Sequence, residues 1–243
     1  MKDGLYHFIV GILDLFLWSG ELVGEENLPS HGPAVFIANH HEAIGPIAVA
    51  CSIPLRMYAW SVADMVDEEK AAAWLKWDFV ERTLHVKPPV SGWVAKRLSK
   101  LTVPFLRSLG CIPVYKGDYD RMVETLRLSM DVLRQGKFLL VFPEDNLLPG
   151  DPVTEMRPFQ RSFARLGEMY FEQTGKRLEF YPVAIHPSGH VIVGKAVAFD
   201  PLNAPGLERH RLKDLMEDII RAMYLQYENE PGSEAAALTP QHK

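Results

Sequence analysis

Cysteine is scarce in this chain, and that scarcity limits the class of protein it can be. Cys51 and Cys111 are the two cysteines among 243 residues, and each lies inside an apolar run. Small secreted domains are held together by several disulfides, so two isolated thiols in a chain of this size indicate buried side chains in a reducing compartment. A disulfide framework is excluded, and we expect a cytoplasmic location.

Long apolar runs are missing as well. The strongest one, Leu5 to Trp18, is interrupted by His7 and Asp14 and is shorter than the ~20 residues that span a bilayer. Asp3 and Asp14 disturb the charge pattern of a secretory signal, and no small-residue cleavage site follows clearly. Two interpretations stay open for this run: a monotopic membrane anchor, or a core helix packed under a sheet.

The sequence also lacks clustered metal ligands. His40 and His41 are adjacent, and adjacent side chains point apart in an extended chain. No further histidine or cysteine lies at ligand spacing nearby, so a zinc site is not predicted. We expect no metal and no tightly bound cofactor.

Length and composition favour a globular α/β protein. The chain is 47% hydrophobic, and 243 residues suffice for one domain with a full core. We expect an N-terminal apolar or interfacial helix at residues 1–28, one α/β domain at residues 29–227, and a disordered tail at residues 228–243 that contains Pro231, Gly232 and Ser233.

Charge is distributed unevenly, although the net charge is only −5. Residues 71–110 hold seven basic and two acidic side chains, a net charge of +5, whereas residues 1–70 carry −7. This basic segment includes Trp74, Trp77 and Trp93, and its predicted helix has an apolar stripe opposite three cations: Val94, Leu98, Leu101 and Phe105 against Lys96, Arg97 and Lys100. Two structures fit this pattern: an interfacial helix on an anionic membrane, or an amphipathic core helix with a solvated face.

Other periodic segments predict alternating helices and strands. Asp118 or Asp120 can cap a helix that Gly136 ends, just before a strand at Phe138–Phe142. Further predicted elements are a helix at Phe159–Phe171, a hairpin of His190–Val193 with Lys195–Ala198 around Gly194, and a final helix at Leu207–Tyr227.

A histidine at the mouth of a predicted strand is the first candidate catalytic residue. Residues 34–38 are apolar and are followed by Asn39, His40 and His41, with a turn at Gly45–Pro46. Imidazole titrates near neutral pH, so a histidine in this place can take a proton from a substrate hydroxyl and return it to a leaving group. A capped loop with a surface histidine would give the same local sequence.

Three later segments are also predicted strands with a distinctive residue at or near one end. Gly110–Lys116 is a short strand that leads to a cation, Leu139–Glu144 is a strand that leads to a carboxylate, and Tyr181–Ile185 is a strand with a proline near its start. Together with Asn39 and His40 they resemble, in order, the four sequence blocks of the glycerolipid acyltransferase family of the lysophosphatidic acid type. Those blocks read Asn-His-x-x-x-x-Asp-Pro, Gly-x-x-x-x-x-Arg, Phe-Pro-Glu-Gly-Thr-Arg and a Pro-Val strand, and the resemblance covers roughly residues 30–200.

This resemblance implies a fold and a chemistry. The fold would be a single α/β domain whose central mixed sheet is flanked by helices. The activity would be transfer of a fatty acyl group from acyl-CoA or acyl carrier protein to the hydroxyl of a lysophospholipid, at the inner face of a membrane and without nucleic acid. His40 would be the general base, Asn39 would belong to the substrate site, Glu144 would be an acceptor-site or a structural carboxylate, and Lys116 would contact the phosphate.

The chain departs from the family pattern at several positions. Gly45 stands where the family has the aspartate that orients the histidine, and Lys116 stands where the second block has arginine. A lysine neutralises phosphate as a point charge, without the bidentate fork. In the third block, Asp145 replaces glycine and Leu147 replaces arginine.

Two carboxylates are candidate replacements for the missing aspartate. Glu42 lies two residues after His40, and Asp145 lies in the block that the family fold brings near the histidine. The alternative is that both are solvated loop acids. Arg161, with Arg157 and Arg165 at four-residue spacing, is a candidate substitute for the lost phosphate-binding arginine, and a solvated helix face is the alternative.

Two other functions remain open at this point. A catalytically degenerate member would bind acyl chains or lysolipid without turnover, as Gly45, Asp145 and Leu147 suggest. An acyltransferase with a non-phosphorylated acceptor, such as a sugar or an amine, would also fit the loss of arginine at Leu147.

Overall fold

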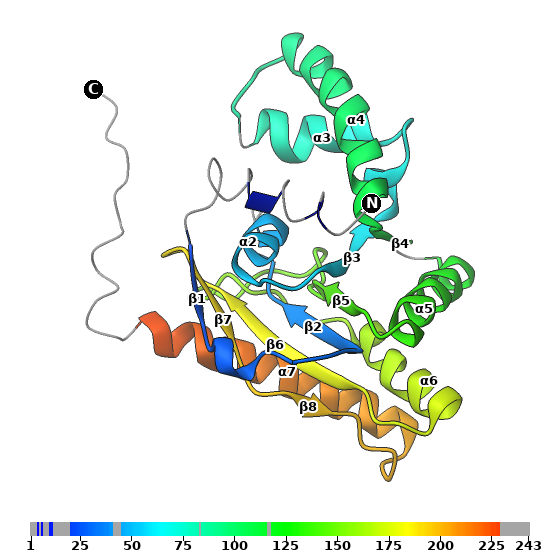
Figure 1. Cartoon of the computed structure of the whole chain (residues 1–243). Coiled ribbons are helices and arrows are strands. Elements are labelled where there is room, and N and C mark those ends of the chain that lie inside the picture. Colours follow the sequence, from blue (N-terminus) through cyan, green and yellow to red (C-terminus); the bar gives the residue numbers. More distant parts are fainter. Residues whose placement is uncertain are drawn as a thin grey trace.

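An eight-stranded mixed β-sheet organises the computed structural model, which describes residues 4, 6, 10–11, 20–40, 45–82, 84–115 and 118–228 (Figure 1). The strand order is β1-β7-β6-β2-β5-β3-β4, and β8 pairs with β6 off this path. The strands are β1 (Glu21–Val23), β2 (Ala34–Ala38), β3 (Met57–Val62), β4 (Ile112–Val114), β5 (Phe138–Val141), β6 (Glu179–Ile185), β7 (His190–Val193) and β8 (Val197–Ala198). The predicted α/β domain with a central mixed sheet is confirmed.

Strand β2 lies at the centre of the sheet, parallel to β5 on one side and to β6 on the other. All five of its residues, Ala-Val-Phe-Ile-Ala, are buried. Such an unbroken apolar run is typical of a parallel strand that is covered on both faces. Since β3 is also parallel to β5 and β4, the carboxyl ends of five strands meet at one edge of the sheet.

Helices cover both faces of this sheet (Figure 1). They are α2 (Gly45–Ser52), α3 (Ala71–Leu75), α4 (Val90–Leu109), α5 (Tyr119–Arg134), α6 (Arg165–Thr174) and α7 (Pro205–Glu228). Val35 and Ile37 of β2 belong to the core that α5, α6 and α7 complete, whereas Phe36 and Ala38 pack with α2 on the opposite face. The alternation of side chains along a strand therefore divides β2 between two cores.

The capping signals of α5 are confirmed. Asp118 is the N-cap, and its Oδ1 accepts a hydrogen bond of 3.0 Å from the backbone N–H of Arg121. Gly136, just beyond the C-terminus, has a φ of 71°, a left-handed conformation in which glycine meets no Cβ clash. The strand that follows, β5, begins at Phe138 as predicted, and the final helix α7 begins two residues before the predicted Leu207.

Two predicted elements differ from the structure. The hairpin around Gly194 was wrong: β7 and β8 both pair with β6, antiparallel to it, and not with each other. β6 is seven residues long, and the N–H of Gly194 donates to the carbonyl of Pro182 in β6. After β7 the chain therefore continues along β6 and does not turn back on β7. The helix predicted from Phe159 begins instead with a 3₁₀ turn, η5 (Arg161–Ala164), before α6, because Phe159 forms a β-bridge with Glu144.

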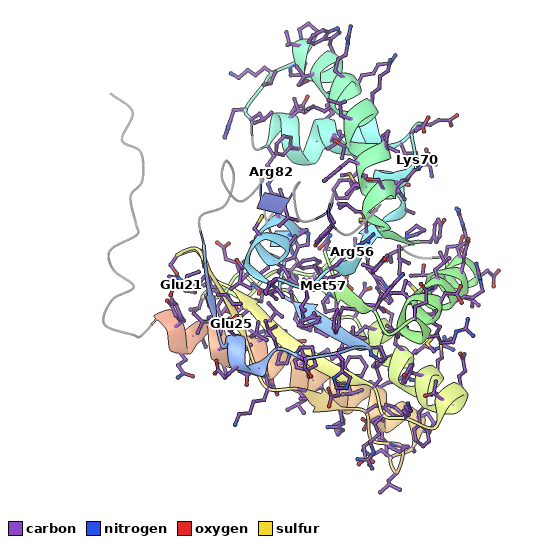
Figure 2. The ribbon with its side chains drawn as sticks, in the orientation of Figure 1. Glu21, Glu25, Arg56, Met57, Lys70 and Arg82 are labelled. Carbon is purple, nitrogen blue, oxygen red and sulfur yellow. The ribbon has the colours of Figure 1, made fainter. Side chains whose placement is uncertain are left out.

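Between β3 and β4 the chain forms a helical unit of α3, the π-helical η4 (Lys76–Glu81) and α4, joined to β3 by the 3₁₀ turn η3 (Ala63–Val66). Leu75, Val80 and Ala95 form a small core within it, separate from the two cores of the sheet. Figure 1 shows α3 and α4 beyond one edge of the sheet, at the opposite end of the molecule from α7 and β8. Figure 2 shows side chains of this unit, Lys70 and Arg82 among them, at that same end.

The face of α4 that packs inward is not the predicted apolar stripe. The buried residues of α4 are small and recur at four-residue spacing: Ser91, Ala95, Ser99 and Val103. Val94 and Leu98 are half-buried at the flank of this face, and Leu101 is exposed. Close packing of α3 on α4 requires small side chains at the contact, and for this reason the larger residues of the stripe are displaced from it.

Most of the N-terminal helix predicted at residues 1–28 lies outside the described residues. The prediction is wrong for its last part, because Glu21–Val23 form strand β1 of the sheet and Glu25–Asn27 form the 3₁₀ turn η1. Tyr6 is described and is buried. The guanidinium of Arg56, the residue before β3, lies 5.7 Å from the centroid of its ring. Burial raises the pKa of the Tyr6 hydroxyl. Within the described part of the chain, no helix is both long enough and apolar enough to cross a membrane.

Both cysteines are free thiols, and each is partly buried. Burial raises the pKa of Cys111 to about 11, so this thiol stays protonated at neutral pH. The Sγ of Cys51 lies 3.8 Å from the carbonyl of Val10, which it meets as a weak donor.

Candidate active site

The carboxyl edge of the sheet gathers three of the predicted site residues. Asn39 and His40 follow the central strand β2, and Glu144 follows its neighbour β5. The next strand on the other side, β6, ends in Ile185 and is followed by a buried histidine, His186. Polar side chains after parallel strands face the same space because all these strands end at one edge.

Asn39 fixes the start of the loop that carries His40. Its buried carboxamide donates to the carbonyl of Ile185 (3.1 Å) and accepts from the N–H of the same residue (2.7 Å). An amide side chain offers both a donor and an acceptor, so it continues the β2–β6 ladder one step beyond the last strand residue. Asn39 therefore positions the loop, and the predicted contact of its side chain with substrate stays a prediction.

Glu144 holds the same loop from the opposite side. Its Oε1 accepts a hydrogen bond of 2.7 Å from the backbone N–H of His40, and its Oε2 accepts one of 3.2 Å from the N–H of Arg157. The side chain is buried. Burial raises the pKa of this carboxyl, while the two N–H donors and the Arg157 charge oppose that rise. The carboxylate links the loops after β2 and β5, so it acts as a structural clamp, and substrate binding by Glu144 stays a prediction.

The side chain of His40 reaches solvent, although its backbone is clamped. Its ring lies edge-on to Phe142, with 5.4 Å between centroids and 70° between planes. An exposed imidazole with one face limited by an aromatic neighbour is accessible to a substrate and restricted in orientation. These are the properties that the predicted general base requires.

Gly45 lies next to His40, and the structure leaves room for a side chain there. A Cβ built on Gly45 would lie 4.0 Å from the carbonyl carbon of His40, 3.5 Å from Cδ1 of Ile185 and 3.8 Å from Cε1 of Phe142. These are ordinary van der Waals distances, and Gly45 is not among the described glycines with a positive φ. Within the part of the chain that the structure describes, neither the contacts of a Cβ nor the backbone conformation requires glycine at this position.

Asp145 makes local hydrogen bonds. Its Oδ1 accepts from the N–H of Leu147 (3.1 Å), and its own N–H donates to the carbonyl of Pro158 (2.9 Å). The first bond is an Asx turn, a common use of aspartate in loops. Among the described residues, no hydrogen bond or ion pair joins the Asp145 carboxylate to His40, so its predicted role as the orienting group is not supported by a contact.

Several other predicted residues do not join this edge in the described structure. Glu42, Lys116 and His41 lie outside the described residues. Arg161, in η5, has its Nη1 2.6 Å from Nε2 of His210 on α7. Leu147 is 92% exposed, at the tip of the loop that the third block begins.

The sequence predicted Arg157 only as one of three arginines at four-residue spacing, and the structure places it beside Glu144. Its backbone reaches Glu144, its charge lowers the pKa of that carboxyl, and its Nε is buried without a hydrogen bond among the described residues. No local signal distinguishes it from Arg161 and Arg165, since the distinction depends on the Glu144–Phe159 bridge. His186 was also missed, because a single histidine after an apolar strand has no partner that the sequence reveals.

A pH-dependent stability difference tests whether burial dominates the environment of the Glu144 carboxyl. Since burial raises the pKa of Glu144 in the folded state, its contribution to stability is fully present below the unfolded pKa near 4.5 and is lost as pH rises through the folded value. We expect the free energy of unfolding of wild type, relative to Glu144→Gln, to fall as the pH rises above about 4.5. Denaturant unfolding of both proteins across this range measures it, and a relative stability that rises with pH would contradict the assignment.

The fold is similar to that of a solved acyltransferase. The chain matches the crystal structure of PlsC from Thermotoga maritima, a 1-acyl-sn-glycerophosphate (LPA) acyltransferase, with a TM-score of 0.56 and 13% sequence identity, over 95% of this chain and 84% of that one. At this identity the match shows a shared fold, and the chain is thus an α/β protein of the acyltransferase fold. No family model and no curated protein sequence matches the chain.

Proposed function

We propose that this protein is an acyltransferase that moves a fatty acyl group from acyl-CoA or acyl carrier protein to the hydroxyl of a lysophospholipid such as a 1-acylglycerol 3-phosphate. The observation that carries the proposal is the placement of His40. Its side chain is accessible at the carboxyl end of the central strand, on a loop held by Asn39 and Glu144. The fold similarity to an LPA acyltransferase supports the substrate class.

In the proposed mechanism, His40 removes the proton of the acceptor hydroxyl as its oxygen attacks the thioester carbonyl. The tetrahedral intermediate collapses with cleavage of the carbon–sulfur bond, and the imidazolium returns the proton to the leaving thiolate. The products are an ester and a free thiol, so no oxidant, metal or acyl-enzyme takes part. Asn39 and Glu144 act by holding the loop, which fixes the distance of the imidazole from the acceptor.

The cation for the acceptor phosphate is proposed to be Lys116, as the resemblance implies. Arg157 is a second candidate, because its guanidinium lies close enough to Glu144 to lower the pKa of that carboxyl. Its bidentate geometry suits phosphate better than a lysine does. Arg161 is less suited, since its guanidinium is engaged with His210 on α7. The protein would act at the inner face of the membrane as a peripheral protein, with no resident cofactor and no nucleic acid.

A second candidate function is a lipid-binding protein without turnover. The departures from the family pattern at Gly45, Asp145 and Leu147 favour it, and the Asp145 carboxylate accepts a hydrogen bond within its own turn. Such a protein would bind a lysolipid or acyl chain at the same edge of the sheet. The two candidates differ in whether product forms.

The test is a product assay. Purified protein is incubated with mixed acyl-CoAs or acylated carrier protein and a panel of lysophospholipids, with the corresponding monoacylglycerol as the phosphate-free acceptor. Mass spectrometry of the lipid extract is expected to show a diacyl phospholipid. Product on monoacylglycerol alone would indicate a non-phosphorylated acceptor, and lipid binding by folded protein without any product would establish the non-catalytic function.

A further inference from the structure

The outer surface of α4 combines exposed apolar and basic side chains on one face. We define the α4 basic face by Val90, Trp93, Lys96, Arg97, Lys100 and Leu101. At 3.6 residues per turn these six side chains project within an arc of about 140°, opposite the buried Ser91–Val103 row. Trp93 is 63% exposed and Leu101 is 72% exposed.

Exposed apolar side chains are concentrated in this part of the molecule. Of the eleven large hydrophobic side chains that are exposed in the described residues, five lie between positions 77 and 101: Trp77, Leu84, Val90, Trp93 and Leu101. Scattered single exposed hydrophobics are normal on a protein surface, whereas a group of them in one short segment marks an interaction site. The concentration therefore points to a partner for the helical unit.

The cations of the α4 basic face lack acidic partners among the described ion pairs. Elsewhere in the same unit, Arg107 pairs with Glu68 at 2.9 Å and Lys70 with Asp64 at 3.3 Å. Lys96, Arg97 and Lys100 form no such pair, and the guanidinium of Arg97 lies 5.2 Å from the Trp93 ring centroid. Together with Trp93 these three cations line a shallow hollow of about 280 Å³, which contains none of the candidate catalytic side chains.

The geometry points to an anionic phospholipid surface as the partner: we infer that the α4 basic face docks the protein on a membrane that contains anionic lipid. Tryptophan side chains favour the headgroup region, and interleaved lysine and arginine side chains attract anionic headgroups while their stems lie along apolar surface. A second copy fits less well, because a two-fold contact through this face would bring three unpaired cations against three others. The inference rests on this surface and does not require acyl transfer.

The test is flotation of full-length protein with vesicles of phosphatidylcholine, either alone or with about a third phosphatidylglycerol. We expect wild type to float with the anionic vesicles and to be released by added salt. The variant Lys96→Gln/Arg97→Gln/Lys100→Gln is expected to bind about a hundredfold more weakly, since each basic side chain near the surface contributes about fivefold. The variant Trp93→Gln/Leu101→Gln is expected to lose on the order of tenfold through its smaller apolar contact.

Matched controls lie on the opposite end of the molecule. Lys176→Gln/Arg177→Gln/Lys195→Gln removes the same charge from exposed positions, and Leu202→Gln/Leu207→Gln removes exposed apolar side chains near the start of α7. Both control variants are expected to bind like wild type. All five proteins should have equal thermal unfolding midpoints, because the changed side chains are exposed.

Three results would overturn the inference. Wild type could fail to bind anionic vesicles, the control variants could lose as much binding as the α4 variants, or sedimentation could show a dimer that the Trp93→Gln/Leu101→Gln change dissociates. Since the assay contains no acyl donor, it gives the same answer whether or not the proposed transferase activity is found.

Discussion

Replacing His40 by alanine is expected to lower the acyl-transfer rate by about 10²- to 10⁴-fold, the range that a general base contributes. The change should leave the fold intact, because the imidazole is exposed and the clamp from Glu144 binds the backbone N–H of residue 40. Initial rates with a saturating acyl donor, measured by release of free thiol, give the ratio of kcat values. Lipid binding by the variant should remain.

The exposed His31 supplies a matched control for this measurement. It is bonded to Ser30 outside the sheet edge, so His31→Ala is expected to retain the wild-type rate. If His40→Ala also keeps a rate within about twofold of wild type, His40 is not the base, and the mechanism proposed above fails. A loss of rate with an equal loss of lipid binding would instead indicate a binding role for the imidazole.

Introducing an aspartate at Gly45 is expected to raise the transfer rate by about ten- to a hundredfold. Among the described residues, the added Cβ would meet only ordinary contacts, with His40, Ile185 and Phe142, so the position beside the histidine can take a side chain. In a serine protease triad, disabling the orienting aspartate costs about 10⁴ in rate, which sets the upper scale of the gain. The position is also the first residue of α2, where the helix dipole favours a negative charge.

Two companion variants make this prediction decisive. Gly45→Asn has nearly the same shape as Gly45→Asp without the charge, so a gain in both would reflect packing and not orientation of the imidazole. Asp145→Asn tests whether Asp145 already replaces the missing group: if it does, this variant loses activity and Gly45→Asp gains little. The local contact of Asp145 with Leu147 leads us to expect an unchanged rate in Asp145→Asn. Thermal unfolding of each variant excludes an effect through stability.

Strand β2 and the two ends of α5 were predictable because their signals are local, whereas β1 and β3 were not predicted. The apolar run of β2, the cap at Asp118 and the glycine after α5 each act within a few residues of themselves, and each is found where the sequence predicts it. The hairpin at Gly194 was not predictable in the same way. Whether β7 and β8 pair with each other depended on the length of β6, a strand that pairs with both of them.

Within the candidate site, the sequence identified the residues but not the tasks of their side chains. Asn39 was expected at the substrate and Glu144 either at the acceptor site or in a structural role, and their side chains bind backbone groups of Ile185, His40 and Arg157. These partners lie 146, 104 and 13 residues away along the chain. A pairing at such separations has no periodic pattern, and only the packed sheet brings it about.

The sequence by itself determined the class of fold, the position of His40 after a strand, and the basic segment at residues 71–110. Periodicity and composition are properties of neighbouring residues, so they can be read without a structure. Only the tertiary structure decided which face of α4 is exposed, that Asp145 bonds its own turn, and that Gly45 has room for a side chain. Each of these depends on close packing between segments that are distant in sequence, and packing of this kind is set by the whole fold.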